Sequence, residues 1–234
     1  MGINIEQKGR PFPPFAETIN LVDQYPSPTQ LRDTYINTTD SERIGIIRLW
    51  MTEGIPFAFK NHPILYEEVR GFIANGTNVN PKEVTLVGSG RTGYSLSKSE
   101  WGRPFNNGSD FDFVIISNEM YGTLVKEFQT WVKDFSSNKV LPQNPNEMRV
   151  WLENIKYLDK KIPSGFIQLK LLPYNNTYPL VKKCYDTLWI LKRRLRYTKP
   201  IPAVADASIR VYSSWRACVR QLRINFNSAL SLRY

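Results

Sequence analysis

Two aspartates at the start of an apolar strand constrain this chain more than any other feature. Residues 110–116 read Asp-Phe-Asp-Phe-Val-Ile-Ile. Because successive side chains of a strand point to opposite faces, Asp110 and Asp112 project from one side, about 7 Å apart along the backbone, while Phe111 and Phe113 point to a core. Like charges this close are unfavourable unless a cation neutralises them. The pair predicts a clasp for a hard divalent cation; the plain alternative is a polar strand start at the end of a loop.

A second apolar run, residues 84–87, precedes the aspartates and ends in Gly88-Ser89. At such a turn the backbone amides and the serine hydroxyl can face a phosphate. Arg91 and Thr92 follow closely, and they can add a charge-assisted contact and a hydroxyl donor. Turn formation and surface solvation are the alternative roles of these two side chains.

The order of a strand, Gly88-Ser89, a loop and then Ser-Asp-Phe-Asp-Phe-Val-Ile resembles the DNA polymerase β-like nucleotidyltransferase superfamily. The resemblance covers residues 84–117. It implies an α+β fold with a small mixed or antiparallel sheet, the acidic pair on a central strand, and flanking N-terminal and C-terminal helices. It also implies Mg²⁺ or Mn²⁺ at Asp110 and Asp112, and an NTP such as ATP as the donor. The residues expected to contact that nucleotide are Gly88, Ser89, Arg91, Thr92, Ser109 and Lys170.

Active members of this superfamily carry a third carboxylate on a later strand. Here residues 165–172 are the predicted strand, and Gln168 stands at the best-aligned position. An amide can hold water or ligate weakly, but it cannot act as a carboxylate base. Three explanations stay open: an acid from elsewhere, such as Glu153 or Asp159, a single well-held metal, or nucleotide binding without turnover.

The interval between Ser89 and Asp110 is longer than is common in the superfamily. This extra length contains Trp101 and Phe105. Either aromatic ring could stack on a base or ribose of the donor. Packing of both rings beneath the loop is the alternative.

Positive charge is concentrated in the last quarter of the chain. Residues 1–178 hold 19 Lys or Arg and 19 Asp or Glu, whereas residues 179–234 hold 12 and 2, which accounts for the net charge of +10. A basic block beside a phosphate-handling site favours a polyanionic partner, with RNA the leading candidate. The side chains expected to bind it are Arg193, Arg194, Arg216, Arg220 and Arg223. A solvated basic helix is the plain alternative.

Periodicity predicts helices over most of the remaining chain. The expected helices span residues 27–36, 40–50, 63–74, 119–135, 144–157, 179–198 and 208–232. The proline-rich residues 1–27 are expected to lack regular structure, residues 57–59 to form an extended link, and Pro200 and Pro202 to break the chain. The expected organisation is an N-terminal extension (1–78), a nucleotidyltransferase core (79–178) and a basic helical region (179–234) in one compact unit.

Two distant cysteines and one histidine argue against a disulfide framework and a zinc site, and they favour a reducing compartment. No apolar run reaches membrane-spanning length and no leader is recognisable, so we expect a cytoplasmic protein without membrane contact.

The expected activity is transfer of a nucleoside monophosphate from an NTP to a hydroxyl, first of all that of an RNA or tRNA end, with release of pyrophosphate. The alternatives are synthesis of a signalling oligonucleotide, and a module that binds nucleotide, RNA or a cognate protein with little turnover. By resemblance, small members of this kind belong to toxin–antitoxin or antiviral defence systems.

Overall fold

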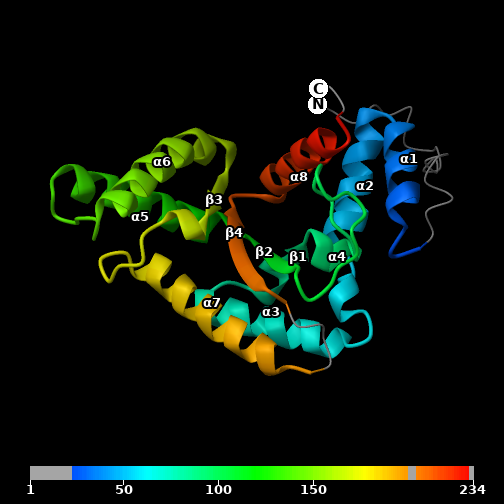
Figure 1. Cartoon of the computed structure of the whole chain (residues 1–234), viewed down its shortest axis with the longest axis horizontal. Coiled ribbons are helices and arrows are strands. Elements are labelled where there is room, and N and C mark those ends of the chain that lie inside the picture. Colours follow the sequence, from blue (N-terminus) through cyan, green and yellow to red (C-terminus); the bar gives the residue numbers. More distant parts are fainter. Residues whose placement is uncertain (1–22, 200–203, 232–234) are drawn as a thin grey trace, which may run out of the picture.

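The computed structural model describes residues 23–199 and 204–231. Its centre is a four-stranded sheet with the order β1-β2-β4-β3 (Figure 1). The strands are β1 (Val84–Val87), β2 (Asp110–Ile116), β3 (Phe166–Gln168) and β4 (Asp206–Tyr212). β2 and β4 are parallel, whereas β1 and β3 run antiparallel to their neighbours. The chain is therefore α+β with a mixed open sheet, and the acidic pair lies on an inner strand as expected.

One face of the sheet carries the main core. Phe111 and Phe113 of β2 and Ile209 and Val211 of β4 point to this face, and all four are buried. The helices that cover it are α3 (Pro63–Thr77), α5 (Asn118–Ser136), α6 (Pro145–Lys161) and α7 (Pro179–Tyr197). In Figure 1, α3 and α7 lie side by side along the sheet. This cover fixes β2 so that its aspartates point the other way.

The opposite face is covered over only part of its length. Cys218 of α8 (Trp215–Ala229) packs against Val114 and Tyr212, near the carboxyl ends of β2 and β4. α1 (Pro28–Ile36) and α2 (Asp40–Thr52) pack on α8, and Tyr35 donates a hydrogen bond of 2.6 Å to Asn227. The amino ends of β2 and β4 extend beyond this cover, and there Asp110 is exposed.

Most predicted elements are confirmed. Both strands around Gly88-Ser89 are present, and the helices predicted over 27–36, 40–50, 63–74, 119–135, 144–157 and 179–198 correspond to α1, α2, α3, α5, α6 and α7. The expectations for Pro200, Pro202 and residues 1–22 lie outside the described residues. Ser27 and Thr39 cap α1 and α2 with reciprocal side-chain and backbone hydrogen bonds, so these two helices begin where local sequence dictates.

Three sequence predictions are wrong. Residues 57–59 form a 3₁₀ helix instead of an extended link. The strand predicted over 165–172 ends at Gln168 and continues as a 3₁₀ helix, Leu169–Leu171. The helix predicted over 208–232 begins only at Trp215, because residues 206–212 alternate polar and apolar side chains and form β4. β4 lies between β2 and β3, so the region after residue 178 is an integral part of the sheet.

Candidate functional site

The amino ends of β2 and β4 bring three aspartates to one end of the sheet. Asp110 pairs in register with Asp206, and Asp112 pairs with Ser208. Residues paired in register point to the same face, so all four side chains share the face that α8 leaves open. They line a cavity of about 360 Å³ together with residues of β3, the 3₁₀ helix after it, and α7.

Gly88 lies directly against this acidic face. Its backbone has φ of +67° and ψ of −151°, a conformation open essentially to glycine alone. A Cβ atom at this position would lie 3.2 Å from Oδ2 of Asp112. Ser89 follows as the first residue of α4 (Ser89–Thr92). The predicted juxtaposition of the Gly-Ser turn and the acidic pair is therefore present.

Asp112 is held by two side chains of β4. Its Oδ1 atom accepts hydrogen bonds from the Ser208 hydroxyl at 2.7 Å and from Nη2 of Arg210 at 3.0 Å. The Arg210–Asp112 ion pair is partly buried on both sides. A guanidinium therefore occupies one side of the predicted metal ligand, and Oδ2 faces the Gly88 turn.

Asp206 is the acidic residue that sequence reasoning missed. Its Oδ1 lies 2.5 Å from Nζ of Lys192 on α7. Burial raises the pKa of Asp206, but hydrogen bonds from Lys192 and from the Ala207 backbone outweigh that effect and lower it. Asp206 is therefore ionised at neutral pH. The signal that could have found it is the polar–apolar alternation of residues 206–212.

Gln168 does not occupy the strand beside the acidic pair. It lies on β3, in register with Arg210, and β4 separates it from β2. Its side chain and that of Lys170 nevertheless line the cavity. Glu153, one alternative source of the third acid, pairs with Arg149 on α6, and neither it nor Asp159 is part of the cavity wall. The acid that lies in register beside Asp110 is therefore Asp206 of β4.

Three residues expected to contact the nucleotide form hydrogen bonds within the chain around the turn. Arg91 is only 2% exposed and donates a 2.8 Å hydrogen bond to the carbonyl oxygen of Ile55. Burial lowers the pKa of Arg91. The buried Thr92 hydroxyl donates to the Tyr94 carbonyl at 2.8 Å, and the buried Ser109 hydroxyl accepts from the Asn106 amide. None of the three side chains lines the acidic cavity.

The aromatic rings of the long loop pack inside the molecule. Phe105 stacks on Phe111 with 5.7 Å between ring centroids and 9° between planes, and Trp101 contacts Phe226 of α8 edge-on at 5.3 Å. Of the two roles considered for these rings, packing beneath the loop is the one found.

The expected RNA-binding arginines lie on two different faces. α7 covers the core face of the sheet and α8 the opposite face. Arg193 is exposed on α7, whereas Arg194 lies over the Phe72 ring of α3 at 4.5 Å. Arg216 and Arg220 line a separate hollow at the start of α8, where Arg220 donates to the Ser164 carbonyl; Arg223 is half-buried. The structure does not join these arginines into one surface.

The residues fit a cation held by Asp110 and Asp112, with Oδ2 of Asp112 beside the Gly88 turn. They do not form a three-carboxylate cage, because within residues 23–199 and 204–231 no three His, Cys, Asp or Glu side chains are grouped closely enough to hold a metal ion. Asp112 is paired with Arg210 and Asp206 with Lys192. A cation would replace Arg210 as the partner of Asp112.

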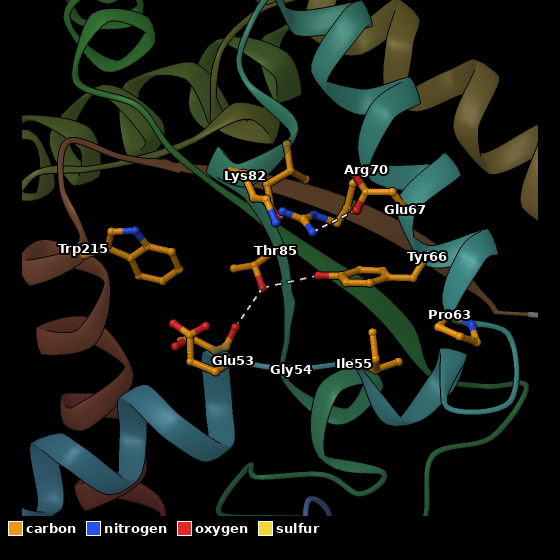
Figure 2. A pocket seen from close by; sticks show the side chains of 12 residues that line it. Glu53, Gly54, Ile55, Pro63, Tyr66, Glu67, Arg70, Lys82, Thr85 and Trp215 are labelled. Atoms are coloured by element: carbon orange, nitrogen blue, oxygen red, sulfur yellow. Dashed lines mark hydrogen bonds and ion pairs between the residues drawn. The ribbon is translucent and has the colours of Figure 1, made fainter.

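A second cavity of about 440 Å³ lies at the outer edge of β1, between the end of α2, α3 and Trp215 (Figure 2). Thr85 donates to the Thr52 carbonyl at 3.1 Å inside it, and Arg70 pairs with Glu67 at 3.0 Å. These polar groups satisfy one another. The cavity holds none of the residues expected from sequence.

Comparison with known proteins gave no match: no family model, no curated protein and no solved structure matches the chain. Among the residues that the structure describes, no helix combines the length and apolar character needed to cross a membrane.

Proposed function

We propose that the protein is a nucleotidyltransferase that moves a nucleoside monophosphate from an NTP to a hydroxyl acceptor, in the first place an RNA end. One observation carries the proposal: a glycine turn that only glycine can adopt lies against Asp112, with Asp110 and Asp206 at the same end of the sheet. Carboxylates beside a glycine turn suit Mg²⁺ and triphosphate binding. When bound, Mg²⁺ or Mn²⁺ neutralises the charge of the triphosphate and of the departing pyrophosphate.

The chain's own residues then have separate roles. Gly88 and Ser89 offer backbone amides to the outer phosphates, and the exposed Lys170 adds positive charge from across the cavity. The acceptor oxygen forms a bond to the α-phosphorus as the bond from that phosphorus to the bridging oxygen breaks. Pyrophosphate leaves with the electron pair, and Asp206, which lines the cavity beside Asp110, is the carboxylate that receives the acceptor's proton.

A turnover-impaired binding module is the second candidate, and the Arg210–Asp112 ion pair favours it. A guanidinium 3.0 Å from Asp112 neutralises the charge on which a metal would depend. Such a module would still bind nucleotide or RNA through the same cavity. The two candidates differ in one property, which is covalent transfer.

Incubation with each α-labelled NTP, Mg²⁺ and total RNA tests the proposal. The label should appear in RNA, and it should disappear in Asp110→Ala combined with Asp112→Ala. Asp206→Asn should reduce transfer about a hundredfold, in the usual range for loss of a general base. Gln168→Ala, which changes the same cavity on the outer strand, should retain transfer within about tenfold.

Two outcomes would contradict the proposal. Label in no molecule with any NTP would favour the binding module, provided that the folded protein still binds nucleotide. Equal losses of label transfer in Asp206→Asn and Gln168→Ala would contradict the proposal that Asp206 of β4 is the third acid. Circular dichroism of each variant separates a lost fold from lost chemistry.

A further inference from the structure

The outer side of α7 presents aromatic and cationic side chains together. Residues three or four apart lie on the same side of a helix. The set with this spacing, named here the α7 stripe, is Trp189, Lys192, Arg193, Arg196 and Tyr197. These five side chains alone line a shallow hollow of about 340 Å³. Trp189 is 59% exposed and Tyr197 is 75% exposed, so both rings face solvent although the opposite side of α7 is buried in the core.

The α7 stripe begins at the acidic cavity. Trp189 and Lys192 line that cavity as well as the hollow on α7. Lys192 also forms the 2.5 Å ion pair with Asp206. A chain bound along the α7 stripe would therefore end beside Asp110, Asp112 and Asp206.

The side chains of the α7 stripe suit unpaired bases. Aromatic rings stack on successive bases while cations follow the phosphates, which is how proteins bind single strands without sequence preference. The Arg193 guanidinium lies 4.7 Å from the centroid of the Trp189 ring, so a charge and a stacking plane are already joined. Bases inside a duplex are stacked on each other and cannot reach such rings. The charge of the helix agrees, since α7 holds six basic side chains and one acidic side chain.

We propose that the α7 stripe binds the single-stranded end of a nucleic acid and leads that end into the acidic cavity. The inference rests on the proposed nucleotidyl transfer, for which it names the acceptor surface. It also assigns nucleic-acid binding to α7 rather than to the arginine row of α8. Arg216 and Arg220 of that row line a hollow separate from the acidic cavity, and Arg220 is engaged with the Ser164 carbonyl.

The proposed stacking of bases on the α7 stripe is tested by measuring the binding of a short labelled single-stranded RNA with fluorescence anisotropy, without NTP or metal. Trp189→Ala combined with Tyr197→Ala should weaken binding about tenfold to a hundredfold, as expected for loss of stacked bases. Tyr157→Ala combined with Trp215→Ala removes two exposed aromatics from other helices and should leave affinity within about twofold. A duplex of the same sequence should not respond to the Trp189 and Tyr197 changes.

The salt dependence of binding tests the charge part. Arg193→Gln combined with Arg196→Gln should reduce the slope of log K against log salt by about 1.4, or about 0.7 per lost phosphate contact. Lys156→Gln combined with Lys160→Gln removes the same charge from exposed positions of α6 and should leave the slope unchanged. Because all four positions are exposed, these variants should keep their fold.

Three results would overturn the inference: unchanged affinity in the Trp189 and Tyr197 variant, equal slopes in the two charge variants, or a duplex that responds like the single strand. The outcome is separable from that of the proposed function. RNA binding that depends on the α7 stripe without label transfer would refute only the transferase. Label transfer that is indifferent to the α7 stripe would refute only the acceptor surface.

Discussion

Replacing Arg210 by glutamine should convert the acidic pair into a tighter metal site. Arg210 Nη2 lies 3.0 Å from Oδ1 of Asp112. A metal ion bound to that carboxylate at about 2 Å would lie roughly 5 Å from the guanidinium if Arg210 stayed in place. Arg210 must therefore either move away or oppose the bound cation, and Arg210→Gln removes both penalties.

The size of the effect follows from Coulomb's law. A divalent ion and a guanidinium about 5 Å apart repel each other by roughly 1.7 kcal/mol even at the dielectric constant of water, and by more inside a partly buried cavity. That lower value corresponds to about a tenfold change in affinity. We therefore expect Arg210→Gln to bind Mn²⁺ at least about tenfold more tightly, at low salt, where screening is weak.

Isothermal titration with Mn²⁺, or electron paramagnetic resonance of the free ion, measures this affinity directly. Lys170→Gln is the matched control: it removes the same charge from the same cavity but breaks no contact with Asp112. Its effect should be smaller. Equal or weaker Mn²⁺ binding in Arg210→Gln would refute the competition between arginine and metal. A tightening that persists in the additional presence of Asp112→Asn would place the metal elsewhere.

Other changes test the packing and the turn. Gly88→Ala should destabilise the fold by about 1–3 kcal/mol in urea denaturation and abolish transfer, because the new methyl group meets Asp112. Trp131→Ala should lower the free energy of unfolding by about 3–5 kcal/mol, since the ring is fully buried in the core. Burial raises the pKa of Cys184 and Cys218 to about 12, so neither should react with a thiol reagent until the protein unfolds. Stability should fall as pH rises from about 8.5 toward that value, because only the unfolded thiols ionise.

Strand alternation and helix caps involve residues close together in the chain, so the sequence determined the elements that depend on them. The alternation of residues 110–116 specified β2 and the face of its two aspartates, and the caps at Ser27 and Thr39 specified where α1 and α2 begin. The Gly88-Ser89 turn was predicted beside the acidic pair from the resemblance of the two motifs to the nucleotidyltransferase superfamily. The same resemblance implied the α+β fold class, and the structure confirms that class.

Residues 206–212 show where local reading fails. Val211, Trp215 and Cys218 recur at helical spacing, and that spacing concealed the strand that precedes α8. The alternation of Asp206, Ser208 and Arg210 with apolar neighbours carried the correct signal. A short segment can match both the helical spacing of about 3.6 residues and the two-residue alternation of a strand, and pairing with β2 decides between a helix and a strand.

Only the tertiary structure decided which side chains lie next to the pair Asp110 and Asp112. The sequence by itself determined that Asp110 and Asp112 share one face of their strand, because strand alternation is local. Strand order is not local: the parallel strands β2 and β4 are joined by a long crossover that contains α5, α6 and α7, and their pairing places Asp206 rather than Gln168 beside Asp110. The same packing paired Asp112 with Arg210 and brought Lys192 of α7 to Asp206. The acidic pair could be predicted from the sequence, whereas the side chains that interact with it depend on the tertiary structure.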